Sequence, residues 1–341
     1  MYLIPKSEIE IGKVKLYGEN SGINSVEINT SVKDLSQSGK VVVPLNFKQR
    51  DGKKITDLIK IGNSVVIRLG YGENVEEEFR GYVSKVGASA PLTIEVEDEW
   101  YKWKKAEQMN KSWKTTTLRE VLNFVFSGWT VECVDVSLNG GFVIHNATPY
   151  EVVKGLKESY GFSTKIDEKE KTVRCFYAYD FKGFREHTYV FGTRKEEGLE
   201  KLKKRGLSPN VVKNNLKYEK RDDRKLFVTG KSKDKAGKEI RYEIGSKDKG
   251  AERRTLNFGS EVSTLEELKE ITTARYRKWN YDGYTGKITG FGYPQVKAGD
   301  SLSLIDVDNE EREGKYLVES VKVSYSVSGG FRRECSLSYK V

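Results

Sequence analysis

The residues best suited to acid–base chemistry in this sequence are three consecutive carboxylates, Glu97, Asp98 and Glu99. Hydrolysis of a glycosidic bond needs two carboxyl groups on opposite sides of a cleft. These three residues follow an alternating run, and successive side chains of a strand point to opposite faces of the sheet. They therefore cannot form such a pair by themselves, and we expect them to have a structural role.

Metal and nucleophile chemistry has equally little support. The sequence contains two histidines, His145 and His187, and three cysteines, Cys133, Cys175 and Cys335. The cysteines are odd in number and far apart, which disfavours a closed disulfide framework and a zinc site. They are typical of apolar positions in a protein from a reducing compartment.

Two short motifs resemble ligand-binding loops but lack essential parts. The run 306–309 begins like a calcium loop, without the central glycine and the distal glutamate. The run 290–294 is rich in glycine, but Pro294 blocks the helix whose N-terminus would bind a phosphate. The sequence also lacks a phosphate-binding P-loop and a nucleophile elbow. We therefore predict a protein that is not an enzyme and has no catalytic residue, cofactor or metal.

The net charge of +10 is concentrated in one segment. Residues 182–254 carry a balance of +11, and the rest of the chain carries −1. Such a segment can contact nucleic acid or an acidic protein face. Because it contains no recognisable nucleic-acid motif, a solvated lysine-rich surface is the favoured interpretation. The candidates for a basic contact surface are Lys203, Lys204, Arg205, Lys220, Arg221 and Arg224.

Aromatic and basic residues also alternate between Trp100 and Lys114. Such a run could stack on a single-stranded nucleic acid. Its rings could equally seal a seam between domains while the lysines face water, which we favour.

The elements that would position these residues are mostly strands. Of the 341 residues, 37% are hydrophobic and 32% are charged, which is too apolar for a disordered chain. No apolar run approaches the roughly 20 residues that span a bilayer, and the first residues do not resemble a signal peptide. We therefore expect neither a membrane-spanning nor a classically secreted protein.

Hydrophobic periodicity divides the chain into three parts. Residues 1–99 contain several short alternating runs, typical of a β-barrel. Residues 100–183 contain two capping boxes, Thr117–Glu120 and Thr148–Glu151, each starting a helical pattern among short strands. Residues 184–341 return to strands, with helices expected near 195–205 and after Ser263. The predicted fold class is mainly β, with two similar β-barrel domains flanking a small α+β domain.

One internal similarity supports the two barrels. The run 61–67 resembles 298–304, and in each copy a Gly-Asn or Gly-Asp turn precedes a strand. An acidic turn, a second strand and a final alternating strand follow in both copies. The matched order of four features indicates a duplicated unit.

Four stretches that span nearly the whole chain share their order of features with one known family. They are residues 62–98, where that family has a "G-D-x-V-x-I … F-x-G-x-I … ED" pattern, the helix 117–126, the strand and capped helix of 142–162, and residues 290–331. In these features the chain resembles the baseplate hub proteins of contractile-tailed phages, the late control protein D family. The hub part of type VI secretion spike proteins is a relative. Residues 182–254 match the family least.

The resemblance implies a structural role. Hubs of this family are homotrimers in which three chains form a ring of six similar barrels, joining a sixfold tail tube to a threefold cell-puncturing spike. Expected partners are two further copies of the chain, a spike protein and a tail tube or tube-initiator protein, with DNA in the lumen as a further hypothesis. The expected location is the tail baseplate of a virion assembled in the bacterial host cytoplasm.

Several alternatives stay open. The chain could be the hub of a phage-derived injection device, such as a tailocin or a secretion system. Because it ends at Val341, shortly after the second barrel, we expect any spike to be a separate protein, which favours the phage-like or tailocin-like arrangement. A nucleic-acid-binding barrel protein and a cell-wall-degrading tail enzyme are the other classes. The sequence names neither the interface residues nor the face that meets the tube.

Overall fold

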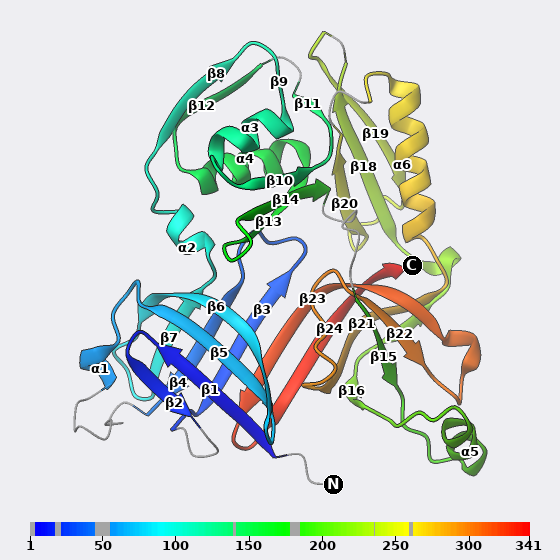
Figure 1. Ribbon diagram of the computed structural model, residues 1–341. Coiled ribbons are helices and arrows are strands. Elements are labelled where there is room, and N and C mark those ends of the chain that lie inside the picture. Colours follow the sequence, from blue (N-terminus) through cyan, green and yellow to red (C-terminus); the bar gives the residue numbers. More distant parts are fainter. Residues whose placement is uncertain are drawn as a thin grey trace.

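The structure is a computed structural model that describes residues 4–17, 22–44, 55–138, 141–177, 185–234, 236–258 and 262–341. Within these ranges the chain is mainly β, with an α+β insertion above a large curved sheet (Figure 1). The predicted fold class is confirmed. The expected boundary at 99/100 falls at the start of a short helix, whereas the boundary at 183/184 lies outside the described residues.

The first group of strands, which we call repeat 1, forms the left half of the sheet in Figure 1. Strand β7 shows why these residues form strands, since Leu92, Ile94 and Val96 are buried while the residues between them are half-buried. The elements of repeat 1 are β1 (Pro5–Ile11), β2 (Val14–Tyr17), β3 (Ser25–Ser31), β4 (Ser38–Val43), α1 (Ile55–Leu58), β5 (Ser64–Tyr71), β6 (Asn74–Val86) and β7 (Leu92–Glu97).

The second group, repeat 2, forms the other half of the same sheet. Its elements are β15 (Glu186–Val190), α5 (Glu196–Lys204), β16 (Val211–Asn214), β17 (Lys217–Glu219), β21 (Gly283–Phe291), β22 (Ser301–Ile305), β23 (Gly314–Ser326) and β24 (Gly330–Lys340). The expected helix near 195–205 is α5.

The two repeats have the same strand order. Repeat 1 runs β3-β4-β7-β6-β5-β1, and repeat 2 runs β16-β21-β24-β23-β22-β15. One pairing differs, because β1 is antiparallel to β5 whereas β15 is parallel to β22. Strand β3 pairs with β23 and joins the two halves into one sheet of 14 strands.

The insertion follows β7 and packs around its own core. Thr117 and Thr148 form the two expected capping boxes, and Gly161 ends the second long helix in a left-handed conformation. Its elements are α2 (Trp100–Trp103), β8 (Met109–Trp113), β9 (Thr116–Thr117), α3 (Leu118–Val125), β10 (Thr130–Cys133), β11 (Ser137–Leu138), β12 (Phe142–Ala147), α4 (Pro149–Tyr160), β13 (Phe162–Asp167) and β14 (Thr172–Tyr177).

A second small layer interrupts repeat 2 between β17 and β21. It is a three-stranded sheet with one helix, formed by β18 (Leu226–Lys233), β19 (Glu239–Gly245), β20 (Glu252–Asn257) and α6 (Leu265–Trp279). The helix expected after Ser263 is α6, and it covers β18 and β19. This layer and the insertion lie side by side above the large sheet (Figure 1).

The core follows this division. One cluster of buried side chains runs through both repeats, from Ile9 in β1 to Leu337 in β24. A second cluster fills the insertion and includes Trp100, Leu122 and Phe162. Among the described residues, no helix has the length and apolar character needed to cross a membrane.

Candidate functional site

The turn before β5 has a specific set of backbone hydrogen bonds. The N–H of Gly62, at φ +86°, donates to the carbonyl of Val83, and the N–H of Val83 donates back to Asn63. The side chain of Asn63 closes the turn, because its Oδ1 accepts the N–H of Lys60 at 2.7 Å. The positive φ favours glycine at position 62.

The turn before β22 repeats these bonds atom for atom. Gly299, at φ +97°, donates to Val318, and Val318 donates back to Asp300. Asp300 closes the turn by accepting the N–H of Lys297 at 2.8 Å. The similarity found in the sequence is therefore a true structural repeat.

The register of the following strands also matches. In repeat 1, Val83 lies opposite Val96, and a bulge then places Lys85 opposite Glu95. In repeat 2, Val318 lies opposite Leu337, and the same bulge places Ser320 opposite Ser336. A bulge shifts the register by one residue, so its presence at the same place makes Lys85 and Ser320 equivalent.

The junction between the repeats is a strand pair with a buried ion pair beside it. Glu78 in β6 and Arg333 in β24 lie 2.6 Å apart, and their side chains are only 3% and 2% exposed. Arg333 also donates to the carbonyls of Gly292 and Val296, both at 3.0 Å. Burial raises the pKa of Glu78 even though Arg333 acts to lower it. We call this group the junction latch.

Neutral hydrogen bonds extend the junction. The hydroxyl of Tyr71 in β5 donates to the carbonyl of Phe331 at 2.7 Å and accepts the N–H of Gly292 at 3.1 Å. The ring of Tyr71 also packs on Phe331, with ring centroids 5.5 Å apart. These contacts fix the relative position of the two repeats.

A second buried polar pair lies within repeat 2. His187 Nε2 and Asp300 Oδ2 are 2.9 Å apart, with 11% and 6% of their side chains exposed. In addition to this contact with His187, Asp300 accepts hydrogen bonds from the backbone N–H groups of Arg185 and Lys297. No partner for His187 could be identified from the sequence, since Asp300 is 113 residues away.

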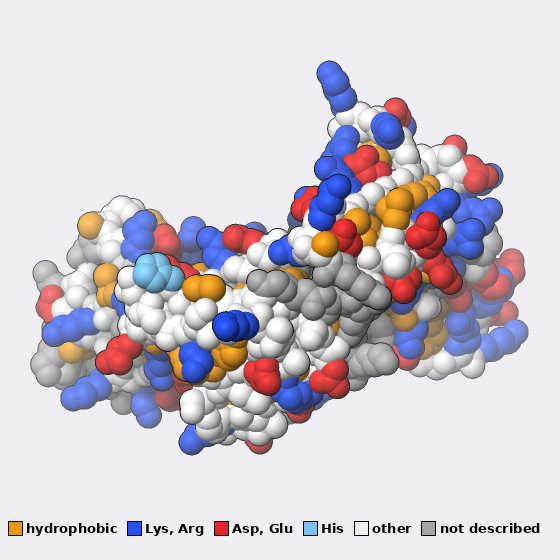
Figure 2. All heavy atoms as spheres, turned by 90° about the horizontal axis from the view of Figure 1, so that it is seen from above, with side chains coloured by type: hydrophobic (Ala, Val, Ile, Leu, Met, Phe, Trp, Pro, Cys, Tyr) orange, Lys and Arg blue, Asp and Glu red, His pale blue; other side chains and the backbone are white. Residues whose placement is uncertain are grey.

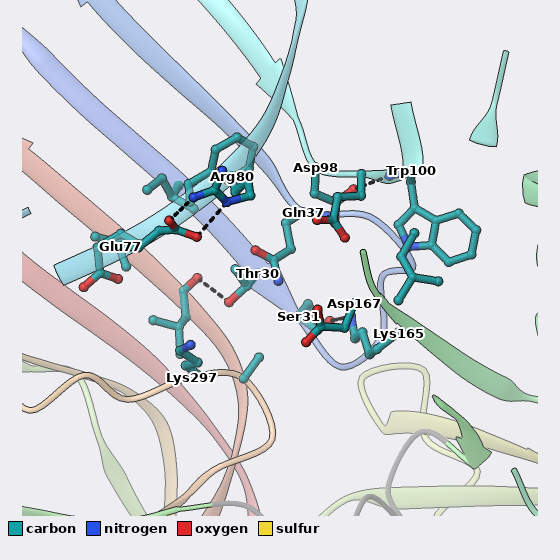
Figure 3. Close-up of a pocket in the computed structure, with 18 of the residues that line it drawn as sticks. Thr30, Ser31, Gln37, Glu77, Arg80, Asp98, Trp100, Lys165, Asp167 and Lys297 are labelled. Atoms are coloured by element: carbon teal, nitrogen blue, oxygen red, sulfur yellow. Dashed lines mark hydrogen bonds and ion pairs between the residues drawn. The ribbon is translucent and has the colours of Figure 1, made fainter. Parts of the chain in front are cut away.

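A cavity of about 390 Å³ lies where the two repeats meet the insertion. Figure 3 shows Asp98, Lys165 and Lys297 around it, from three separate parts of the fold. Apolar side chains and charged side chains of both signs line it together, including Glu77 and Arg80, which pair with each other. The mixed charges give this cavity no preference for one class of ligand.

The carboxylates that the sequence singled out border this cavity. Asp98 accepts the N–H groups of Gln37 at 2.7 Å and Trp100 at 3.2 Å, and burial raises its pKa to about 7. Glu99 accepts the N–H of Glu168 at 3.1 Å, and burial raises its pKa to about 7 as well. Both hold the insertion onto repeat 1, in agreement with the expected structural role.

Five of the six candidate basic contact residues are exposed, and one is buried. Lys203, Lys204 and Arg205 lie at the end of α5, and Lys220 and Arg221 follow β17. Arg224 is 9% exposed, and its guanidinium stacks on Tyr281 with 4.2 Å to the ring centroid.

The assignment of Arg224 to a contact surface is therefore wrong. An arginine can lose its exposure by stacking on an aromatic ring, which charge alone does not reveal. Figure 2 shows basic and acidic side chains intermixed over the visible face of the described residues. One of the five exposed candidates, Arg205, pairs with Glu313 at 3.2 Å.

The remaining candidates have ordinary structural positions. Asp306 accepts the hydroxyl of Tyr284 at 3.1 Å, and Trp100 and Trp103 pack against Phe126. Cys175 and Cys335 are buried and Cys133 is half-buried. Within the part of the chain that the structure describes, no group of three or more metal-ligating side chains comes together.

Comparison with solved structures finds the same fold in tail proteins. A tail protein from Neisseria meningitidis gives a TM-score of 0.61 at 13% identity, over 98% of this chain and 96% of that chain. The 43 kDa tail protein of prophage MuSo2 from Shewanella oneidensis gives 0.59 at 15% identity, over 98% of each chain. An Escherichia coli component of the type VI secretion system, itself structurally similar to bacteriophage T4 tail proteins, gives 0.54 at 8% identity, over 98% of this chain and 77% of that chain.

These similarities hold at the level of the fold. No protein-family model matches the chain, and no curated protein matches its sequence. The resemblance to tail hub proteins that the sequence predicted is confirmed in the fold, because the matched proteins share almost the full length of the chain.

Proposed function

We propose that this chain is a structural hub protein of a phage tail baseplate or of a related injection device. Three copies would form a ring that adapts a sixfold tail tube to a threefold spike. The observation that carries the proposal is the structural repeat, with its matched turn, bulge and strand order.

The repeat supports this role through symmetry. Three chains with two similar barrels each provide six similar units around one axis, while the differences between the repeats retain threefold symmetry. One face of such a ring could thus meet a sixfold partner and the other a threefold partner. The fold shared with tail proteins and with a secretion component supports the same role.

The other expected partners belong to this proposal. A spike protein and a tube or tube-initiator protein would bind the two faces of the ring, at the tail end of a particle assembled in the host cytoplasm. The exposed residues Lys203, Lys204 and Lys220 are candidates for contact with DNA or with an acidic protein face. Nearby carboxylates partly balance this charge, as in the pair between Arg205 and Glu313.

Light scattering coupled to size exclusion, measured over a range of salt and protein concentrations, tests the proposal. At high protein concentration we expect a mass of about three times 38.9 kDa, and this mass should persist at high salt. A matched variant with Lys203→Glu and Lys204→Glu should keep that mass, because these side chains lie outside the repeat junction. A monomer that binds single-stranded DNA with a steep salt dependence would contradict the proposal and favour a nucleic-acid-binding protein.

A further inference from the structure

We propose that the free edge of residues 217–220 in repeat 2 pairs, antiparallel, with the free edge of residues 84–87 in repeat 1 of a second copy of this chain. The inference rests on the proposed ring, and it names the surface and the register of the contact between copies. It follows from the strand pairing of β3 with β23, which joins the two repeats within one chain.

The internal contact is the pairing of β3 with β23. Ser31 lies opposite Ser320, and Thr30 lies opposite Val321. Just before this register begins, the N–H of Val32 donates to the carbonyl of Glu319 at 2.9 Å. Strand β3 of repeat 1 therefore uses the edge of β23 that β22 leaves free after Val318.

The edge of β23 that pairs with β3 is called the receiving edge. The bulge that both repeats share identifies the equivalent edge in repeat 1. Since Val83 matches Val318 and Lys85 matches Ser320, residues 84–87 match residues 319–322. Strand β5 pairs with β6 only as far as Tyr82, and the turn bonds end at Val83. Among the described residues, the edge beyond Val83 has no strand partner.

Strand β3, which pairs with that edge, is called the donating strand. The register of the neighbouring strands identifies its equivalent in repeat 2. Gly39 pairs with Val96, and Gly286 pairs with Leu337, so these two glycines match. Asn29 lies one residue beyond this point opposite Ser38, and Lys217 lies there opposite Thr285. Residues 217–220 therefore match residues 29–32.

The outer edge of β17 is also open. Strand β17 pairs only with β21 in the described part of the chain, and Lys217 and Lys220 are exposed. An unpaired edge presents a row of N–H and carbonyl groups that another strand can complete. Within the residues that the structure describes, each copy thus has one unpaired edge at 217–220 and one at 84–87, which is the requirement for a head-to-tail ring.

When the register of β3 with β23 is applied to residues 217–220 and 84–87, the side chains that meet are chemically complementary. Glu219 takes the place of Ser31 and lies opposite Lys85, so opposite charges meet. Tyr218 lies opposite Val86, and the N–H of Lys220 donates to the carbonyl of Ser84. Lys85 is free to adopt this contact, because its side chain is 68% exposed and its pairing with Glu95 spans 3.6 Å.

The contact between copies lacks the junction latch. By the same register, Leu92 stands where repeat 2 has Arg333, and Leu92 is fully buried. The pairing between copies therefore depends on the strand edge and on the charge pair between Glu219 and Lys85. We expect it to be weaker than the internal junction and dependent on protein concentration.

Disulfide trapping tests the register directly. Because Val32 and Glu319 share a hydrogen bond, the next pair, Ser31 and Ser320, is a non-hydrogen-bonded pair, with Cα atoms about 4.5 Å apart. That spacing suits a disulfide. In a Cys133→Ser background, oxidation of the Lys85→Cys/Glu219→Cys variant should link chains and end at species of three chains on a non-reducing gel.

The matched control is the Lys85→Cys/Lys220→Cys variant, whose second thiol leaves the opposite face of the strand and should not link. A wild-type oligomer whose Lys85→Cys/Glu219→Cys variant forms no cross-link, or cross-links no more than the control, would overturn the register and leave the ring standing. A wild-type chain that stays monomeric, with no cross-link at any concentration, would overturn both.

A charge exchange gives a second test in the reduced protein. Lys85→Glu and Glu219→Lys should each weaken self-association by about two- to fivefold per contact, and the double variant should restore it. Sedimentation at several concentrations measures this. Singles that have no effect, or a double variant that is weaker than both singles, would overturn the pairing of these two residues.

Discussion

In repeat 1 the side chain of Asn63 closes the turn before β5. In repeat 2 the side chain of Asp300 closes the equivalent turn before β22. The backbone hydrogen bonds are the same, but Asp300 also contacts His187, for which repeat 1 has no counterpart among the described residues. The same contrast recurs where Leu92 matches Arg333. At these positions the repeats share their backbone pairing and differ in their buried charge.

This contrast has a physical basis. A Gly turn and a bulge need no outside partner, so they can be repeated in any copy of the unit. A buried charge needs a specific partner, and Arg333 finds Glu78 only because repeat 1 lies beside it. We infer that the buried charges distinguish the internal junction from the contact between copies, as charged pairs do in other specific interfaces.

The largest expected effect on stability comes from replacing Arg333 of the junction latch by leucine, the residue type at the equivalent position of repeat 1. Arg333→Leu leaves Glu78 buried without its cation, so we expect a loss of about 3–5 kcal/mol in the free energy of unfolding. Denaturant unfolding followed by circular dichroism measures this. The matched change, Leu92→Ile, should cost less than about 1.5 kcal/mol, because it conserves an apolar side chain of the same volume.

A double variant distinguishes a charge effect from a packing effect at the latch. Glu78→Gln together with Arg333→Leu removes both charges, and Gln295 can still donate to the side chain at position 78. We expect the double variant to recover a large part of the lost stability. If it is as unstable as Arg333→Leu alone, the latch acts through packing and the contrast in buried charge fails.

A smaller effect is expected at the two turns. Asp300→Asn replaces one accepting oxygen by an NH2 group, so one backbone N–H group, that of Arg185 or that of Lys297, loses its acceptor. We expect a loss of about 1–3 kcal/mol in unfolding free energy. Asn63→Asp keeps the single accepting oxygen that the turn needs and should change it by less than about 1 kcal/mol.

The two turn variants, measured by the same unfolding experiment, must differ for the comparison to hold. Equal losses would mean that the turn itself, which both repeats have, accounts for the stability. A loss at Asp300 that also occurs in the His187→Ala variant, without further loss in the double variant, would locate the effect in the contact between His187 and Asp300.

Local patterns in the sequence predicted much of this architecture. The capping boxes of Thr117 and Thr148 marked their helices, because a cap needs only residues three positions apart. The repeat was visible at Gly62 and Gly299, since a positive φ restricts the residue type. The alternation of apolar and polar residues predicted the fold class, because this pattern within a strand depends only on which of its own faces is buried.

The candidate site depended on contacts that are distant in the sequence, and these could not be predicted. Arg333 lies in an alternating strand in which a charged residue normally faces solvent, yet it pairs with Glu78, 255 residues away. Arg224 was placed on the surface because of its charge, whereas Tyr281 covers it. The parallel pairing of β15 likewise has no local signature.

The smallest expected effect is a pH dependence confined to repeat 1. At Asp98 and Glu99 the chain leaves the sheet for the insertion, whereas the equivalent part of β24 continues as a strand to Lys340. Burial raises the pKa of Asp98 from 3.8 to about 7, so the folded protein binds this proton more tightly than the unfolded chain does. Stability should therefore fall as pH rises through 7, with about 1 kcal/mol lost at Asp98 between pH 6 and pH 8.

Thermal unfolding of the wild type and of Asp98→Asn at pH 6 and pH 8 measures this effect. The wild type should lose more stability between these two pH values than the variant, because the variant has no proton to release at this position. Glu158→Gln is the matched control, since it removes a carboxyl whose side chain is 66% exposed on α4, and it should keep the wild-type pH dependence. If Asp98→Asn keeps it as well, the buried carboxyl is not the group that titrates. The pH dependence would then come from another group at the attachment, such as Glu99, whose pKa burial also raises to about 7.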